Sequence, residues 1–228
     1  MTVDEAADVK ANRLATFLLE QGLAGAGPLS GADQLANEYL IDGSYANDDR
    51  RVDALIKWET TKNFTSGFIT GLGGVVTFPV SIPVALGASW LIQARMAGAI
   101  ARIYGHELDS ERVRTKILLS LAGDVAKEAM KDLGLKLDGK ITQHAVDQVP
   151  GRALVEINKR LGARLLAKVG QRVVLRFPRA VPVVGGVVGG ALDAVVCRMV
   201  GRTAKSLFRP PAGAVIDGDL VKARKRLR

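Results

Sequence analysis

The sequence predicts an all-α protein, with a single helical domain of about eight helices built around two apolar helical hairpins that contain glycine and proline. Three observations lead to this prediction. Apolar residues recur at helical spacing along most of the chain, turn-forming residues separate these segments, and no alternation of apolar and polar residues has the length of a strand. A chain of 228 residues is long enough for one domain with a substantial core.

Three helices are predicted before the apolar centre of the chain. Apolar residues at helical spacing indicate a helix from Val3 to Gly22, where glycine ends it. Ser30 or Asp33 can cap a short second helix, which turn-forming residues end after position 41. Either aspartate of the pair at 48–49 can cap the third helix, which leads into the apolar centre.

The longest uncharged stretch, residues 63–94, is broken by Pro79 and Pro83. Two prolines this close cannot lie inside one regular helix, because each removes an amide hydrogen and clashes with the preceding turn. The stretch is therefore predicted to form two arms around a turn. The second arm is expected to run from near Pro83 to Tyr104, with Gly105 as its stop.

Neither arm is suited to span a membrane. The first arm rises only about 15 Å, against roughly 30 Å of hydrocarbon in a bilayer. The second arm carries Arg95 near its middle, which would cost about 2.5–3.5 kcal/mol at the centre of a bilayer. A buried core hairpin is therefore favoured, and a hairpin inserted shallowly in lipid is the alternative.

A second hairpin is predicted because the proline turn recurs: FPVSIPVALG, from Phe78, matches FPRAVPVVGG, from Phe177. The residues of the two turns are Phe78, Pro79, Pro83, Phe177, Pro178 and Pro182. Glycines at four-residue spacing allow helix backbones to approach closely. We expect the two hairpins to pack together through Gly67, Gly71, Gly185, Gly186, Gly189 and Gly190.

Two more helices lie between the hairpin turns. Asp109 or Ser110 can cap a helix that is predicted to continue to Gly134. Pro150 then breaks the chain before a long helix, which we expect to run from Arg152 to about Arg176.

Basic side chains form stripes on the last two predicted helices. The first stripe has four-residue spacing and consists of Arg160, Arg164, Lys168, Arg172 and Arg176. The second stripe consists of Arg198, Arg202 and Lys205. Such stripes are commonly solvated helix faces, and the sharper interpretation is a surface that contacts the headgroups of anionic lipids.

Acidic and basic residues are distributed unequally along the chain. Residues 1–60 hold 5 basic and 11 acidic residues, a net charge of 5 − 11 = −6, whereas residues 61–228 hold 27 and 12, a net charge of 27 − 12 = +15. We expect residues 1–46 to form acidic helices that pack on a main domain at 47–209, followed by a basic tail at 210–228. The basic body suggests an anionic partner, and pairing of the acidic and basic parts within the molecule is an equal alternative.

No residue pattern indicates catalysis, a metal or a cofactor. His106 and His144 are not placed at metal-ligand spacing, and Cys197 lies on an apolar helix, where a packed small hydrophobe is favoured over a nucleophile. Nucleic-acid binding is disfavoured, because no aromatic platform or recognised motif accompanies the charge. One cysteine and an acidic start without a secretory signal predict a cytoplasmic location.

Several segments resemble the EcsC family of bacterial proteins. These are SGADQLANEYL, LIKWETTKNFTSGFITGLGGVVTFPVSIP, IQARMAGAIARIYGHELDSERVRTKILLSLAGD, PGRALVEINKRLGARLLAKVG and VPVVGGVVGGALDA followed by GRTAKSLF. The resemblance extends from about Ser30 to Phe208. It implies a helical protein that is membrane-associated or cytoplasmic, and it offers no catalytic residues to carry over.

These observations together predict a non-enzymatic protein that binds lipid or the anionic inner face of the cell membrane peripherally. The alternative is a soluble interaction module that regulates a membrane transporter or another partner. An enzyme that acts on a hydrophobic substrate is the third and least favoured hypothesis, since no catalytic site assembles from the residues.

Overall fold

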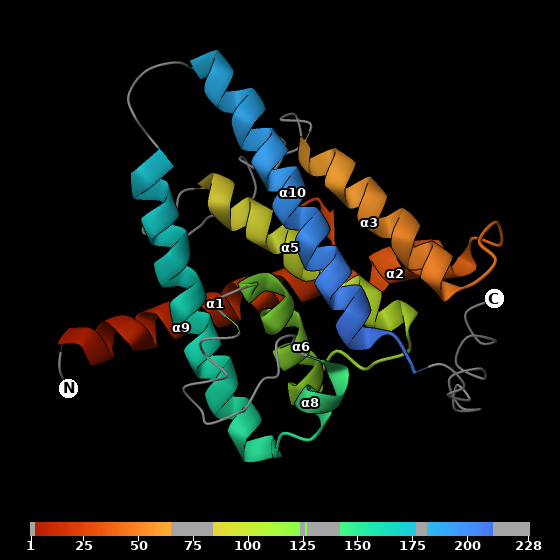
Figure 1. Cartoon of the computed structure of the whole chain (residues 1–228), viewed down its shortest axis with the longest axis horizontal. Coiled ribbons are helices and arrows are strands. Elements are labelled where there is room, and N and C mark those ends of the chain that lie inside the picture. The colour runs from red at the N-terminus through yellow and green to blue at the C-terminus, as the bar shows by residue number, and fades with distance from the viewer. Residues whose placement is uncertain (1–2, 65–83, 124–125, 127–141, 177–181, 212–228) are drawn as a thin grey trace.

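The computed structural model describes residues 3–64, 84–123, 126, 142–176 and 182–211, and within them it confirms the all-α prediction (Figure 1). Two strands of two residues each, β1 and β2, pair antiparallel between the first two helices. The described elements are α1 (Val3–Ala24), β1 (Gly25–Ala26), β2 (Leu29–Ser30), α2 (Ala32–Ile41), α3 (Asp48–Phe64), α5 (Val84–Ile103), α6 (Glu111–Ala122), α8 (Gln143–Asp147), α9 (Gly151–Arg176) and α10 (Pro182–Phe208).

Helix α5 is the centre of the fold. It packs against α1, α2, α3, α6 and α10, and every residue from Gly87 to Ala101 is buried. Small and aliphatic side chains in this segment leave room for neighbouring helices on all sides. The second arm of the predicted hairpin is therefore a buried core helix. The first arm and its turn at 65–83 lie outside the described residues.

The end of α5 agrees with the predicted stop. Gly105 has a φ of +88°, which favours glycine because it has no Cβ atom. Its amide donates to the carbonyl of Arg102 over 2.9 Å, and the amide of His106 donates to Ala101 over 3.0 Å. These bonds satisfy carbonyl groups that the last helical turn leaves without partners.

The predicted caps of α2 and α3 are wrong by one or two residues. Gly31 is the N-cap of α2 and makes no side-chain cap bond, so neither Ser30 nor Asp33 has this role. Asn47 caps α3, because its carbonyl and its Oδ1 both accept from the amide of Arg50, over 3.2 and 3.0 Å. The two aspartates at 48–49 lie instead in the first turn, where the helix dipole favours negative charge.

Helix α6 is shorter than predicted. It begins after Ser110, ends at Ala122 and is followed by Gly123, whose φ of +56° breaks the helix. The predicted continuous helix to Gly134 is therefore wrong at Gly123, and residues 127–141 lie outside the described part of the chain. The long helix predicted from 152 to about 176 is confirmed as α9.

Close helix contacts form at glycines that the sequence analysis did not single out. A Cβ atom at Gly98 of α5 would overlap Leu23 Cδ2 and would lie 2.8 Å from Ala32 Cβ. One at Gly201 of α10 would lie 2.8 Å from Ile56 Cγ1. The hairpin glycines Gly67 and Gly71 lie outside the described residues. The other four, at 185–190, lie in the first turns of α10, and their packing partners are not described.

We expect Gly98→Ala to lower the free energy of unfolding by about 1–3 kcal/mol, measured by urea denaturation. The added methyl group would overlap Ala32 Cβ, which cannot rotate away. Alanine has the higher helix propensity by about 1 kcal/mol, so a loss of stability would show that packing dominates. Gly43→Ala is the control, because nothing lies within 4 Å of that position. A Gly98→Ala protein as stable as the unaltered chain would contradict the prediction.

Candidate functional site

The basic stripe predicted on α9 is only partly described. Arg160 is exposed, and its Nε lies 2.9 Å from Glu156 Oε1 one turn earlier. Arg164 is half-buried. Lys168, Arg172 and Arg176 belong to the helix, but their side chains lie outside the described part. The described portion of this stripe therefore carries less free positive charge than its sequence suggests.

The basic stripe predicted on α10 divides into two parts. Arg198 and Arg202 are exposed and form no ion pair with other described residues. Lys205 is half-buried and faces α3, where its Nζ donates to Asp53 Oδ1 over 2.6 Å. Arg198 and Arg202 are thus the α10 cations available to a partner, while Lys205 holds α10 against α3.

Two exposed aliphatic side chains accompany these arginines. Val195 is 57% exposed and Met199 is 55% exposed. With Arg198 and Arg202 they stand at positions i, i+3, i+4 and i+7, which share one side of a helix. We call these four residues the outer face of α10. The V-x-x-R-M-x-x-R spacing is visible in the sequence, but apolar residues on other sides of this helix conceal which of them are exposed.

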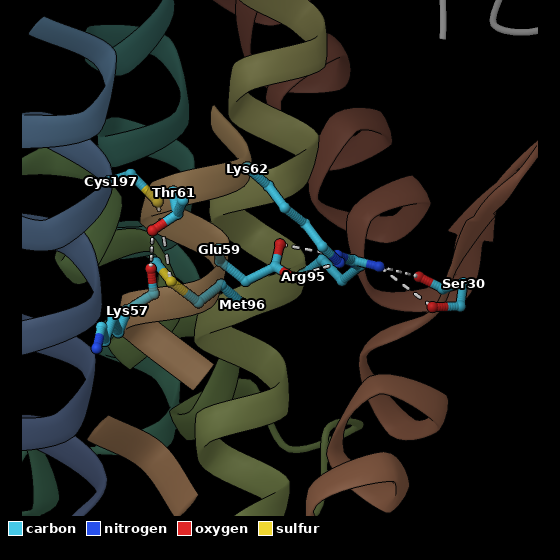
Figure 2. Close-up of polar contacts among 8 residues, drawn as sticks. All are labelled: Ser30, Lys57, Glu59, Thr61, Lys62, Arg95, Met96 and Cys197. Atoms are coloured by element: carbon cyan, nitrogen blue, oxygen red, sulfur yellow. Dashed lines mark hydrogen bonds and ion pairs between the residues drawn. The ribbon is translucent and has the colours of Figure 1, made fainter. Parts of the chain in front are cut away.

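The opposite side of α10 packs on the core. Cys197 is buried, and its Sγ lies 4.0 Å from Met96 Sδ of α5 (Figure 2). The cysteine therefore packs as the small hydrophobe that was predicted. Val200, Ala204 and Leu207 continue the same buried side, so α10 has one side fixed in the core and one directed to solvent.

A buried ion pair connects α3 to α5. Arg95 Nη2 lies 2.8 Å from Glu59 Oε2, and the two side chains are 5% and 0% exposed. Figure 2 shows the other end of the guanidinium directed to Ser30 of β2, where Nη1 donates to Oγ over 3.1 Å. Lys62 adds a second cation, 3.5 Å from Glu59 Oε1. The arginine thereby holds three elements together.

In the sequence, Arg95 stands as an isolated charge in an apolar segment. The structure shows that its partner, Glu59, lies 36 residues earlier. Removing one member of such a pair leaves an uncompensated buried charge, whereas the pair itself adds little net stability. Arg95 and Lys62 both pair with the carboxylate of Glu59. This carboxylate therefore connects structural elements and is not placed to act as a catalytic acid or base.

A second feature is an open groove of about 600 Å³ between α2 and α3, which we call the α2–α3 groove. Its walls are aromatic and its α2 side carries two carboxylates. The lining residues are Glu38, Tyr39, Asp42, Tyr45, Ala54, Lys57, Trp58 and Thr61. Two of the three tyrosines and one of the two tryptophans of the chain therefore gather in one place.

Burial is the main influence on the Tyr39 phenol in the α2–α3 groove. Burial, followed by interactions with Glu59, Tyr45 and Glu38, raises the pKa of the Tyr39 phenol to about 12. The Tyr39 and Tyr45 ring centroids lie 5.9 Å apart. Trp58 is 54% exposed, and Lys62 Nζ lies 5.2 Å from its ring centroid. No sequence pattern predicts this groove, because its walls come from two helices separated by a turn.

The two histidines have local roles. His106 Nε2 lies 2.9 Å from the carbonyl of Phe208, the last residue of α10, and burial lowers the pKa of its imidazole. His144 is exposed and contacts Gln148 over 2.9 Å. Within the described ranges, no group of three or more His, Cys, Asp or Glu residues gathers in a way that could hold a metal ion.

These elements define a class of protein: an all-α domain whose helices surround one buried central helix. Among the described residues, no helix combines the length and the apolar character needed to cross a membrane. The model of the EcsC protein family matches residues 36–210, more than half of the chain. The chain therefore belongs to the EcsC protein family, as its sequence motifs suggested. Comparisons with curated proteins and with solved structures found no match.

Proposed function

We propose that this protein is a non-enzymatic, peripheral lipid-binding protein that contacts an anionic membrane surface through the outer face of α10. The observation that carries the proposal is the exposure of Val195 and Met199 beside two arginines, Arg198 and Arg202, that form no ion pair with other described residues. Exposed aliphatic residues beside basic ones are typical of helices that lie at a membrane interface. Moving these two apolar side chains out of water, into lipid, would lower the free energy of the protein.

The two kinds of side chain have complementary tasks. Arg198 and Arg202 can form charge-assisted hydrogen bonds with phosphate oxygens, and each basic residue near an anionic surface contributes about 1 kcal/mol. Val195 and Met199 can enter the boundary between headgroups and acyl chains. The net charge of +15 on residues 61–228 (27 − 12) adds long-range attraction to the same surface.

Vesicle flotation tests the proposal. The protein is mixed with vesicles of phosphatidylcholine alone or of phosphatidylcholine with phosphatidylglycerol. We expect the protein to float with the vesicles that contain phosphatidylglycerol and to be released by salt, because the Debye length falls from about 10 Å at 0.1 M to about 3 Å at 1 M. A protein that binds neither vesicle, or both equally at all salt concentrations, would overturn the proposal.

A charge-matched pair of variants tests the position of the site. Arg198→Glu with Arg202→Glu is expected to weaken vesicle binding on the order of 100-fold or more, since two attractive charges of about 1 kcal/mol each become repulsive. The control, Arg50→Glu with Arg152→Glu, changes the net charge equally at exposed positions on α3 and α9. Equal losses in both variants would show attraction by net charge without a defined face.

Aliphatic insertion is tested separately. Val195→Ser with Met199→Ser keeps every charge and removes only exposed apolar surface. This variant is expected to bind vesicles more weakly and to be released at lower salt than the unaltered chain. If its binding is unchanged, the outer face of α10 contacts headgroups by charge alone. If the unaltered chain ignores vesicles but captures a membrane transporter through the same four residues, the interaction-module hypothesis replaces the lipid one.

A further inference from the structure

We infer that the α2–α3 groove is a docking site for the basic segment at the end of this same chain, residues 222–228, KARKRLR. Five of its seven residues are Lys or Arg and none is acidic. The inference is independent of lipid binding. According to this inference, the open groove binds the ammonium and guanidinium groups of a segment of the same chain.

The walls of the α2–α3 groove suit cations. Glu38 is exposed and makes no hydrogen bond or ion pair with another described residue, and Asp42 is exposed beside it. Tyr39, Tyr45 and Trp58 offer ring faces, which attract cations through the ring quadrupole. Two lysines oppose this charge, because Lys57 lines the groove and Lys62 Nζ lies 5.2 Å from the Trp58 ring centroid. The attraction for a cation therefore comes from the two exposed carboxylates on the α2 side together with the ring faces.

Trp58 supplies a second argument. A side chain of this size is usually well buried, yet 54% of it is exposed and it lines the groove. Its ring already lies 5.2 Å from the ammonium of Lys62, so cation–π contact at this ring occurs in the structure itself. Core packing does not account for the exposed part of the ring, whereas a cationic partner would cover it.

The chain leaves α10 close to the groove. Figure 1 shows α3 and α10 packed side by side, and Lys205 and Arg209 at the end of α10 pair with Asp53 and Asp49 at the start of α3. From Asp49 to Trp58 the helix rises only about 14 Å. The ten residues at 212–221 can span up to about 33 Å. The basic segment can therefore reach the groove without any change in the described fold.

Tethering makes even a weak contact effective. A segment held by a short linker is present at an effective concentration in the millimolar range, so a site with millimolar affinity is about half occupied and a tighter site is occupied more fully. The distribution of charge along the whole chain also favours docking of the basic segment. Residues 1–60 have a net charge of 5 − 11 = −6, and residues 61–228 have a net charge of 27 − 12 = +15. The acidic part and the basic part attract each other, and the groove is where aromatic walls add to that attraction.

Quenching of Trp58 fluorescence tests the inference in the full-length chain and without lipid. Trp90→Phe leaves Trp58 as the sole tryptophan, since the chain has two. In this background, the five tail cations are changed together (Lys222→Gln, Arg224→Gln, Lys225→Gln, Arg226→Gln and Arg228→Gln). The acrylamide quenching constant is expected to rise about twofold or more, because the groove loses an occupant held at millimolar effective concentration.

Two groove variants provide the matched comparison. Glu38→Gln with Asp42→Asn should raise the quenching constant as the tail variant does. Glu20→Gln with Asp109→Asn, which neutralises exposed carboxylates outside the groove, should leave it unchanged. Circular dichroism checks that each variant keeps its helical content. An unchanged quenching constant in either the tail variant or the groove variant would overturn the inference.

The source of the cation is tested by two further measurements. Added KARKRLR peptide should protect Trp58 in the tail variant and compete poorly with the tethered segment of the unaltered chain. Protection of Trp58 should not depend on protein concentration. Protection that grows with protein concentration would mean that the tail of a second copy occupies the groove, and it would overturn docking within one chain.

Discussion

Replacing Glu59 with leucine is expected to lower the free energy of unfolding by about 3–5 kcal/mol. The change leaves the guanidinium of Arg95 buried without its carboxylate partner, with Ser30 as its remaining hydrogen-bond partner in the described structure. It also removes the carboxylate oxygen that lies 3.5 Å from Nζ of the half-buried Lys62. Urea denaturation followed by circular dichroism measures the loss.

Substitution of Arg95, the partner of Glu59, distinguishes the cost of an uncompensated buried charge from the cost of lost packing. Arg95→Leu is expected to cost less than Glu59→Leu, because Lys62 still compensates the carboxylate of Glu59. The double variant should recover part of the lost stability, since replacing both members of a buried pair with apolar residues is often neutral or better. Glu156→Gln on the exposed α9 pair is the control and should change stability by less than about 1 kcal/mol. A Glu59→Leu protein that resembles this control would contradict the prediction.

Phe208→Ala is expected to lower the free energy of unfolding by about 3–5 kcal/mol, because a fully buried aromatic side chain would be replaced by a cavity. The ring is the last side chain of α10. Its centroid lies 5.3 Å from that of His106, and Lys116 Nζ lies 5.9 Å from it. Removing the ring would therefore unpack the end of α10 from α6 and from the turn after α5. Thermal and urea denaturation measure the change.

Two comparisons make this result specific. Phe208→Leu keeps much of the buried volume and should cost less than Phe208→Ala. Phe17→Ala removes a ring that is 39% exposed, so it should also cost less. If the two alanine variants lose the same stability, the packing of the α10 end on His106 and Lys116 contributes nothing beyond an ordinary surface contact.

The helices could be predicted from the sequence because their signals are local. The apolar segment after Pro83 was predicted to end at Gly105, and α5 ends two residues before that glycine. Apolar periodicity and helix-breaking residues act within a few turns of the chain, so the sequence displays them directly. The caps were less accurate. Asn47 replaced the predicted aspartates because neighbouring residues of similar capping preference compete for one position.

The candidate sites could be predicted only in part. The basic stripe of α10 was visible in the sequence, but not that Lys205 pairs with α3 while Arg198 and Arg202 remain exposed. The exposure of Val195 and Met199 depends on which side of α10 faces the core. A helix with apolar residues on several sides does not show from its own sequence which of them neighbouring helices will cover.

By itself, the sequence determined that this protein is all-α, that an apolar helix begins near Pro83 and ends near Gly105, and that the chain carries the motifs of the EcsC family. The tertiary structure alone decided the partner of Arg95, the outer face of α10 and the α2–α3 groove. The physical reason is the range of the interactions. Helix formation depends on neighbours within a few turns, whereas charge pairing and exposure depend on residues that only folding brings together.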